Sequence, residues 1–165
     1  MKITLQQCIF LISNLTKKQT QLTSLLTGQY VVPLAVNGKD TADKTKEEQM
    51  RKDLDEIDVL SEDIVRLKSA LSLANNENKM EGRTIYEVLE EVRIKRSVLY
   101  QVQYSLDREY SKVETGVGVV RYGVLNEELM REKRDSLEKE VNSLSEKVDV
   151  ANASIQIEVD LLGTY

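Results

Sequence analysis

The chain has 165 residues, of which 31% are charged and 41% hydrophobic, and it contains one proline, one cysteine and no histidine. This length predicts a single domain, residues 1–165, and the lack of histidine excludes Ser-His-Asp triads, Cys-His pairs and histidine metal sites. The formal net charge of −5 argues against a broad basic face for nucleic-acid polymers, while a local basic pocket stays open.

The amino-terminal segment "ITLQQCIFLIS" has the weak outline of a secretory signal. Gln6 and Gln7 interrupt its apolar run, and no small-residue cleavage site follows. No segment approaches the roughly 20 apolar residues that span a bilayer. The lone Cys8 cannot form an internal disulfide and lies in an apolar stripe, which is typical of a core thiol. We therefore expect a cytoplasmic protein without a membrane partner.

Hydrophobic spacing at alternating threes and fours predicts two helices in the first half of the chain, at about 2–27 and 45–74. Gly28 is well placed to end the first helix. The segment "QYVVPLAVNGKDT" follows, with β-branched residues, the single proline and an Asn37-Gly38 turn signal. It predicts a loop with an extended stretch at about 29–36. Residues 1–39 contain no acid, so the first helix has a setting unlike that of the rest.

Two further helices are predicted in the second half, at about 84–110 and 125–153. The third opens on a capping box, in which Thr84 and Glu87 satisfy each other's backbone amides. Extended stretches are expected at about 117–122 and 155–161, the former pairing with the latter or with 29–36. The sequence shows no internal repeat.

Helices of this length indicate an all-α fold, an elongated antiparallel helical bundle of coiled-coil hairpins with four helices and a short β supplement. The chain has many Leu, Val and Ile but few large aromatics. Such a core leaves apolar surface on a monomer, so we expect a homo-oligomer.

The segments "GRTIYEVLEEVRIKRSVL", "VVRYGVLNEELMREKRDSLEKEV" and "ANASIQIEVDLL" occur in this order. In that order they resemble the septicolysin-like family of small, uncharacterised prokaryotic helical proteins, best over residues 50–165. The resemblance implies a helical hairpin fold and no assigned reaction. The cytolysis suggested by the family's name is not carried over, because the chain has no pore-forming segment.

The glycine-rich stretch "TGVGVVRYG" does not fit a nucleotide motif. Gly116 and Gly118 lack the spacing and the following Lys-Ser/Thr of a Walker loop, and Gly123 is too late for a dinucleotide fingerprint. Adjacent acids such as Glu90-Glu91 and Glu127-Glu128 point about 100° apart on a helix. They predict solvated faces, with an oxygen-only metal site as the alternative. We expect no catalytic residue, metal or cofactor.

A stripe of arginines and tyrosines lies beside the apolar stripe of the third helix. Guanidinium groups bind carboxylate or phosphate oxygens, and tyrosine rings stack on bases or donate hydrogen bonds. The stripe either packs across a helix interface and pairs with acids, or lines a pocket between subunits for a small anionic, nucleotide-like ligand. The candidate contacts are Arg93, Arg96, Tyr100, Tyr104 and Arg108, with Arg121 and Tyr122 from the connector.

Three classes of function follow from these features. The first, which we expect, is a non-catalytic homo-oligomer that binds or sequesters a small anionic ligand at the Arg/Tyr stripe. The second is a helical scaffold or adaptor for a protein partner, with the stripe paired to carboxylates and an apolar strip exposed elsewhere. The third is an enzyme that uses a carboxylate base and a bound metal.

Overall fold

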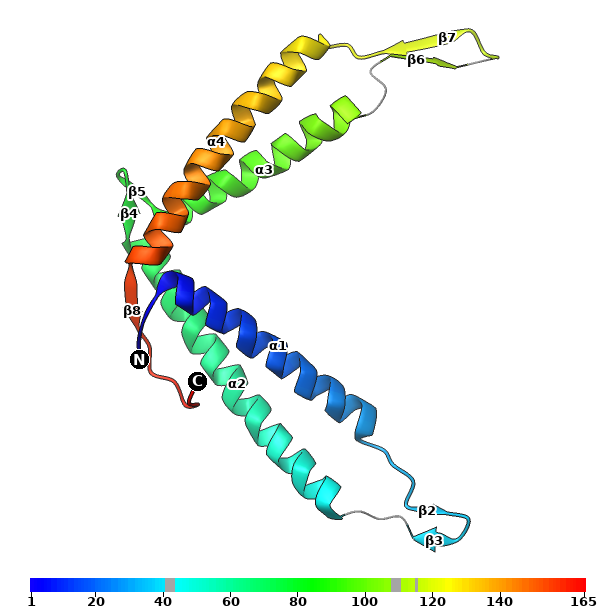
Figure 1. The fold of residues 1–165 in the computed structure, drawn as a ribbon, viewed down its shortest axis with the longest axis vertical. Helices are drawn as coiled ribbons and strands as arrows, with labels where there is room; N and C mark the ends of the chain where they lie inside the picture. The colour runs from blue at the N-terminus through cyan, green and yellow to red at the C-terminus, as the bar shows by residue number, and fades with distance from the viewer. Residues whose placement is uncertain (41–43, 108–110, 115) are drawn as a thin grey trace. The chain divides into compact units, whose positions relative to one another are not determined.

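The computed structural model describes residues 1–40, 44–107, 111–114 and 116–165. Four helices dominate the described part of the chain, joined by short strands (Figure 1). This confirms the predicted all-α class with a β supplement. The helices are α1 (Leu5–Gln29), α2 (Lys44–Glu77), α3 (Ile85–Asp107) and α4 (Glu127–Ser154).

The chain divides into two compact units. Unit 1 comprises Met1–Ala74 and Asn152–Tyr165, and unit 2 comprises Asn75–Ala151. Each unit is a hairpin of two helices with a short β-hairpin between them (Figure 1). The sequence predicted one helical domain, so the division into two units is new information from the structure.

Unit 1 packs α1 against α2 in antiparallel directions. The Cys8 thiol donates to the carbonyl oxygen of Leu67 (3.6 Å), and Gln19 Nε2 donates to Ser61 Oγ (2.7 Å). The apolar stripes of the two helices meet between these contacts. The buried cluster consists of Ile3, Cys8, Leu15, Leu60, Ile64, Leu67 and Val159.

Two small sheets complete unit 1. Strand β1 (Lys2–Thr4) pairs with β8 (Gln156–Glu158), and β2 (Ala35–Val36) pairs with β3 (Lys39–Asp40), both antiparallel. The β2–β3 turn holds Asn37 and Gly38 at φ 51° and 76°. Asn and Gly tolerate this left-handed conformation best, so the predicted turn is confirmed.

Unit 2 repeats the antiparallel helix pair with α3 and α4. Lys147 Nζ contacts Glu81 Oε1 at 2.6 Å, whereas Lys95 Nζ contacts Glu140 Oε2 at 2.6 Å. As the residue number rises from Glu81 to Lys95, the number of its partner in α4 falls from Lys147 to Glu140. The two helices are therefore antiparallel. The buried side chains belong to Ile85, Val88, Val92, Leu137, Val141, Val148 and Ala151.

The sheets of unit 2 are also two-stranded. Strand β4 (Lys79–Met80) pairs with β5 (Arg83–Thr84), and β6 (Ser111–Glu114) pairs with β7 (Val119–Tyr122). The predicted partners of residues 117–122 were therefore wrong. Neighbouring segments of one β-hairpin meet with less loss of chain entropy than distant ones, so β7 pairs with β6.

Two further predictions need correction. Helix α1 continues through Gly28 to Gln29, and its C-cap residue Tyr30 is still right-handed, so Gly28 does not end it. At the other end, a capping box that the sequence analysis missed starts the helix at Leu5. The amide of Gln7 donates to Thr4 Oγ1 (3.1 Å) and the Thr4 amide to Gln7 Oε1 (2.9 Å).

The structure also shows a repeat that the sequence concealed. Both halves run in the order strand, capping box, helix, β-hairpin, helix, strand. The first amide of α1, Leu5, donates to Ile155 O (3.0 Å), and that of α3, Ile85, donates to Asn78 O (3.1 Å). Ile155 immediately precedes β8, the last strand of the second half, and Asn78 immediately precedes β4, the last strand of the first half. The two hydrogen bonds therefore occupy equivalent places in the two units.

The second helices repeat the same buried positions. Leu60, Ile64 and Ala74 of α2 are buried, and so are Leu137, Val141 and Ala151 of α4 at the same spacing. Two of these three pairs are identical, but most other residues of α2 differ from those of α4 at the same spacing, which explains why residue-by-residue reading finds no repeat. The repeated property is the burial of an apolar side chain, which many sequences satisfy.

Candidate functional site

The structure accounts for two arginines of the stripe within unit 2. Arg93 Nη2 forms an ion pair with Glu90 Oε2 on the same helix (2.7 Å), and Arg96 Nη2 donates to Ser145 Oγ of α4 (2.8 Å). The Glu90 contact raises the pKa of Arg93. Both guanidinium groups thus have partners inside their own unit.

The tyrosines of the stripe form a pair on the surface of α3. The rings of Tyr100 and Tyr104 stack, with centroids 6.3 Å apart and planes inclined by 13°. Both side chains are exposed. A shallow groove of 250 Å³ beside α3 is lined by other residues, Ser97, Val98, Gln101, Val102, Ser105 and Met130.

The remaining stripe residues are described only in part. Arg108 lies outside the described residues, and Arg121 is described only as part of the β7 backbone. Tyr122, at the end of β7, has 75% of its surface exposed. The structure therefore places Arg93, Arg96, Tyr100 and Tyr104 along α3, and none of the four lines the 250 Å³ groove beside that helix.

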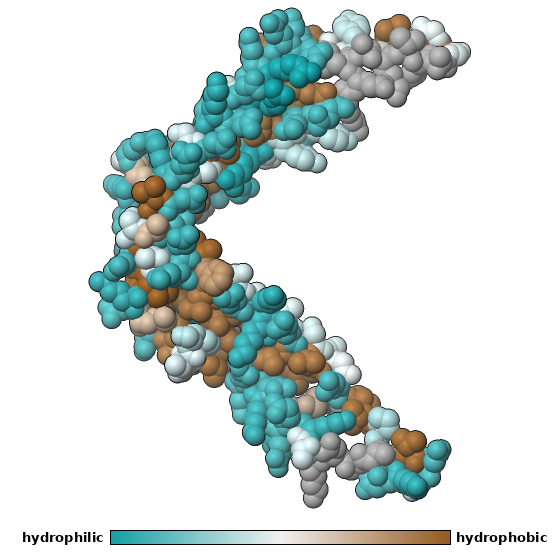
Figure 2. Space-filling view, viewed as in Figure 1, coloured by the Kyte–Doolittle hydropathy of each residue, from teal (hydrophilic) through white to brown (hydrophobic). Residues whose placement is uncertain are grey.

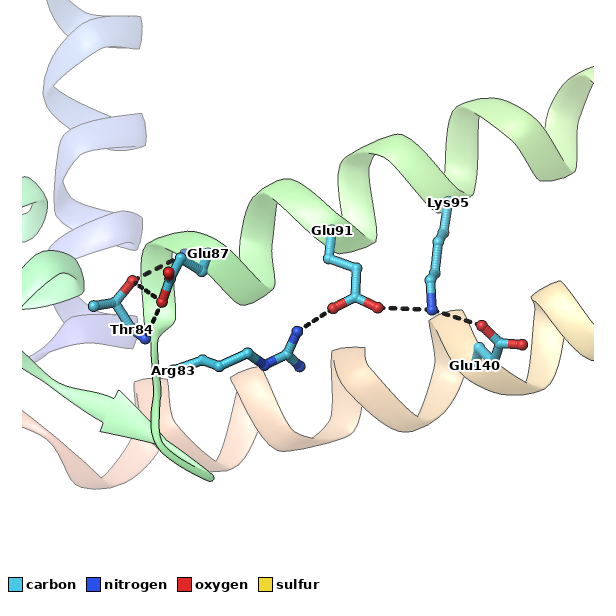
Figure 3. Close-up of polar contacts among 6 residues, drawn as sticks. All are labelled: Arg83, Thr84, Glu87, Glu91, Lys95 and Glu140. Atoms are coloured by element: carbon cyan, nitrogen blue, oxygen red, sulfur yellow. Dashed lines mark hydrogen bonds and ion pairs between the residues drawn. The ribbon is translucent and has the colours of Figure 1, made fainter.

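A chain of ion pairs links Arg83 of β5, two residues of α3 and Glu140 of α4 within unit 2 (Figure 3). Glu91 accepts from Arg83 and lies 2.7 Å from Lys95 Nζ, which also contacts Glu140 at 2.6 Å. Hydrogen bonds from Lys95 and then from Arg83 lower the pKa of Glu91 to about 2. The hydrogen bond to Glu140, and to a smaller extent the one to Glu91, raises the pKa of Lys95.

These ion pairs bear on the adjacent acids considered as metal ligands. Glu90 is engaged by Arg93, and Glu91 by Arg83 and Lys95. Glu127 is engaged by Arg131 at 2.6 Å. Among the described residues, no group of three His, Cys, Asp or Glu side chains is arranged to hold a metal ion.

Unit 1 contains a buried carboxylate that the sequence analysis did not find. Asp63 is fully buried on α2 and accepts three hydrogen bonds from the carboxyl-terminal tail. The donors are the amide of Leu162 (2.8 Å), the amide of Gly163 (2.9 Å) and the hydroxyl of Tyr165 (2.8 Å). Arg66 reaches the same tail, with Nη1 donating to Asp160 O at 3.0 Å.

The environment of Asp63 favours its ionised form. Burial alone raises its pKa, but the bonds from Leu162, Gly163 and Tyr165 and the charge of Arg66 outweigh burial and lower it. Burial and the contact with Asp63 raise the pKa of Tyr165 to about 12. This cluster fastens the tail over the unit 1 core, where Val159 is buried, and its polar groups satisfy one another.

Exposed apolar residues collect at the free end of each helical hairpin. The unit 1 tip, residues 30–40, contains Tyr30, Val31, Val32, Leu34 and Val36. The unit 2 tip, residues 116–125, contains Val117, Val119, Val120, Tyr122, Val124 and Leu125. Val31 has 85% of its surface exposed and Val124 has 92%. Figure 2 shows brown apolar atoms at both ends, among atoms drawn in grey.

The unit 1 tip also bounds a groove. It has a volume of 780 Å³ and lies between the end of α1 and the start of α2. Leu26, Met50 and Leu54 give it an apolar lining, and the Glu47–Arg51 ion pair lies beside them. No residue from Gln19 to Gly38 is charged. The α1 side of this groove is thus uncharged, whereas its α2 side carries Lys46, Glu47, Arg51 and Asp53.

The remaining candidate, Cys8, is part of the apolar core of unit 1. Cys8 is buried, and burial raises the pKa of its thiol, which makes it a poor nucleophile. Within the described residues, no helix is long and apolar enough to cross a membrane.

Comparisons with known proteins inform the fold alone. No protein-family model matches the chain, and no curated protein matches it. The chain is similar to a solved structure, that of a functionally unknown conserved protein from Corynebacterium diphtheriae. The two are 18% identical with a TM-score of 0.74, and the match covers 96% of this chain and 100% of the other. The four-helix architecture is therefore shared with a protein that has no assigned function.

Proposed function

We propose that this protein is a non-catalytic scaffold or adaptor that contacts protein partners through its two tips. The observation that carries the proposal is the gathering of exposed apolar residues at the same place in both repeats. Contiguous exposed apolar patches on a soluble domain mark sites of interaction. The helices between the tips and the tail act as spacers in this proposal.

The partners of the arginines favour this proposal over ligand sequestration. Arg93 and Arg96 are engaged by Glu90 and Ser145, so an anion would have to compete with contacts inside the unit. In the tips, by contrast, the apolar side chains of Val31 and Val120 are exposed to solvent, and a partner can cover them without breaking any hydrogen bond of the side chain. Burying such side chains against a partner contributes about 25 cal/mol per Å².

Photo-crosslinking at single positions tests the proposal. A photoreactive residue replaces Val31 or Val120 in the tips, or Val65 on α2 as a control with comparable exposure. In cells that make the protein, we expect discrete crosslinked adducts from the tip positions and none from Val65. Equal adducts from all three positions, or none from the tips, would contradict the proposal.

A second function rests on the exposed Tyr100–Tyr104 pair, whose stacked rings lie on the same helix as Arg96. A small anionic, nucleotide-like ligand between subunits could displace Ser145 from Arg96 and stack on these rings. Native mass spectrometry of the purified protein with added nucleotides tests this function. We expect an adduct with the wild type that Arg96→Ala weakens at least tenfold, and an unchanged spectrum counts against the ligand.

The other expectations from the sequence stay as proposals. We propose no reaction, metal or cofactor, and we keep membership of the septicolysin-like family as a hypothesis. A cytoplasmic location is also proposed, supported by the single unpaired Cys8.

A further inference from the structure

Strand β7 at the unit 2 tip has an open edge. In the described part of the chain, β7 (Val119–Tyr122) has a neighbouring strand on one side only, namely β6. Its sequence, Val-Val-Arg-Tyr, is rich in residues that favour strands. An exposed edge of this composition is a template for pairing with another chain.

The described side chains of β7 also pack little against unit 2. An isolated two-stranded hairpin is at best marginally stable in water, and it needs a third strand or a packed face. Val120 has 61% of its surface exposed and Tyr122 has 75%, so neither packs into the unit 2 core. An additional strand would supply both the missing hydrogen bonds and an apolar cover.

The distribution of charge favours contact between two copies at the unit 2 tip. The chain carries a net charge of −5, and α2 and α4 are rich in acids. The acidic surfaces of α2 and α4 of two copies therefore repel each other, whereas residues 116–125 contain Arg121 as their sole charged residue. Two unit 2 tips can therefore approach each other at a lower electrostatic cost than two acidic helix surfaces.

We infer that β7 of one copy pairs antiparallel with β7 of a second copy, forming a four-stranded sheet and a two-fold symmetric dimer. The inference deepens the proposed function, on which it rests, by naming a second copy as the occupant of the unit 2 tip. Such an interface is isologous and closes at two subunits. The two-residue strands of the unit 1 tip are too short to form an equivalent ladder.

The sequence of β7 is compatible with itself in one register. When all four residues pair, Val119 lies opposite Tyr122 of the other copy, and Val120 lies opposite Arg121. Aromatic and β-branched residues form favourable cross-strand pairs, and the two arginines do not oppose each other. This register makes a specific prediction about which backbone positions meet.

Sedimentation velocity of the full chain tests the dimer. We expect the dimer fraction of the wild type to rise between about 1 µM and 1 mM, the range of weak interfaces. Val120→Lys should reduce association at least tenfold, because an edge lysine blocks strand pairing. Val65→Lys is the matched control, since Val65 is also 61% exposed but lies on α2. It should leave association unchanged.

Disulfide trapping tests the register. Val119→Cys and Tyr122→Cys variants are prepared separately, each retaining the buried Cys8. Under a mild oxidant, the mixture of the two should form a crosslinked dimer at least tenfold faster than either variant alone. Equal rates in the mixture and in the separate variants would overturn the register.

The inference fails if the wild type stays monomeric throughout, or if Val120→Lys and Val65→Lys behave alike. That failure is distinguishable from failure of the proposed function. A monomeric protein whose tips still crosslink to other proteins in cells remains an adaptor without self-pairing. A monomer whose tips form no adduct loses both proposals.

Discussion

At the scale of single residues, Asp63 ties the carboxyl-terminal tail to α2. It is a buried carboxylate whose three donors all come from the carboxyl-terminal tail. A buried charge is tolerated only when it is fully hydrogen-bonded, so the tail and Asp63 depend on each other. Arg66 adds a further contact to the tail backbone.

Asp63→Asn should lower the free energy of unfolding by about 1.5–3 kcal/mol, the range for hydrogen bonds to a charged group. The amide retains the volume of the side chain but loses the charge and one acceptor. Urea unfolding measures the change. Tyr165→Phe removes only one of the three bonds and should cost about 1 kcal/mol. If Asp63→Asn leaves the urea midpoint unchanged, the tail is not fastened by this group.

The same residue predicts an acid dependence. The folded pKa of Asp63 is lowered, below the value of about 3.9 of an unfolded chain. Its stabilisation is therefore fully present above about pH 4 and is lost as the pH falls through the lowered folded value. Amide exchange of Leu162 and Gly163 should accelerate, relative to the intrinsic rate, over that range. Asp63→Asn should already show fast exchange at neutral pH, and a wild type without acid sensitivity would contradict this.

At the scale of elements, equivalent capping boxes begin α1 and α3. The Glu87 amide donates to Thr84 Oγ1 (3.2 Å) and the Thr84 amide to Glu87 Oε2 (2.7 Å), as the sequence predicted. Thr4 and Gln7 do the same for α1. In both cases the capping threonine is also the last residue of a short strand. The box thus sets where strand turns into helix in each repeat.

Thr84→Ala and Thr4→Ala should each destabilise the protein by about 1 kcal/mol, the usual cost of losing an N-cap. Thr20→Ala is the control, because the Thr20 hydroxyl donates to Thr16 O within α1 and caps nothing. It should change stability by less than about 0.5 kcal/mol. Thermal unfolding of the three variants measures the differences. A Thr20→Ala effect as large as the other two would mean that capping is not the cause.

At the scale of the whole molecule, two similar units are joined by two helices. Helix α2 crosses the boundary after Ala74 and α4 crosses it after Ala151, at equivalent positions of the repeat. The strand that follows each of these helices pairs with the strand that opens the other half. Each of these two sheets therefore lies within one unit and is reached by a helix that crosses the boundary.

This connectivity predicts cooperative unfolding. Leu60→Ala in unit 1 and Leu137→Ala in unit 2 remove equivalent buried side chains and should each cost about 2–5 kcal/mol. Because continuous helices link the units, each variant should show one transition by circular dichroism, and hydrogen exchange should rise in both units. Two separate transitions, or exchange confined to the mutated unit, would show that the units unfold independently.

The sequence alone determined the class of the fold, four helices with apolar stripes, the start of α3 and the turn at Asn37-Gly38. These features depend on local spacing and on the conformational preferences of neighbouring residues, which a sequence states directly. Helix ends differed by a few residues, because fraying and capping compete there. The Arg/Tyr stripe was placed on α3, but its partners Glu90 and Ser145 were not identified.

Only the tertiary structure decided which strands pair, that the chain divides into two similar units, and that Asp63 is buried. Leu60, Ile64 and Leu67 mark the buried face of α2, and Asp63 lies on it, but its donors are remote in sequence. Strand pairing likewise follows from which segments the helices bring together. The exposure of the tips also became visible only in three dimensions, because a valine in a sequence looks the same whether it is buried or exposed.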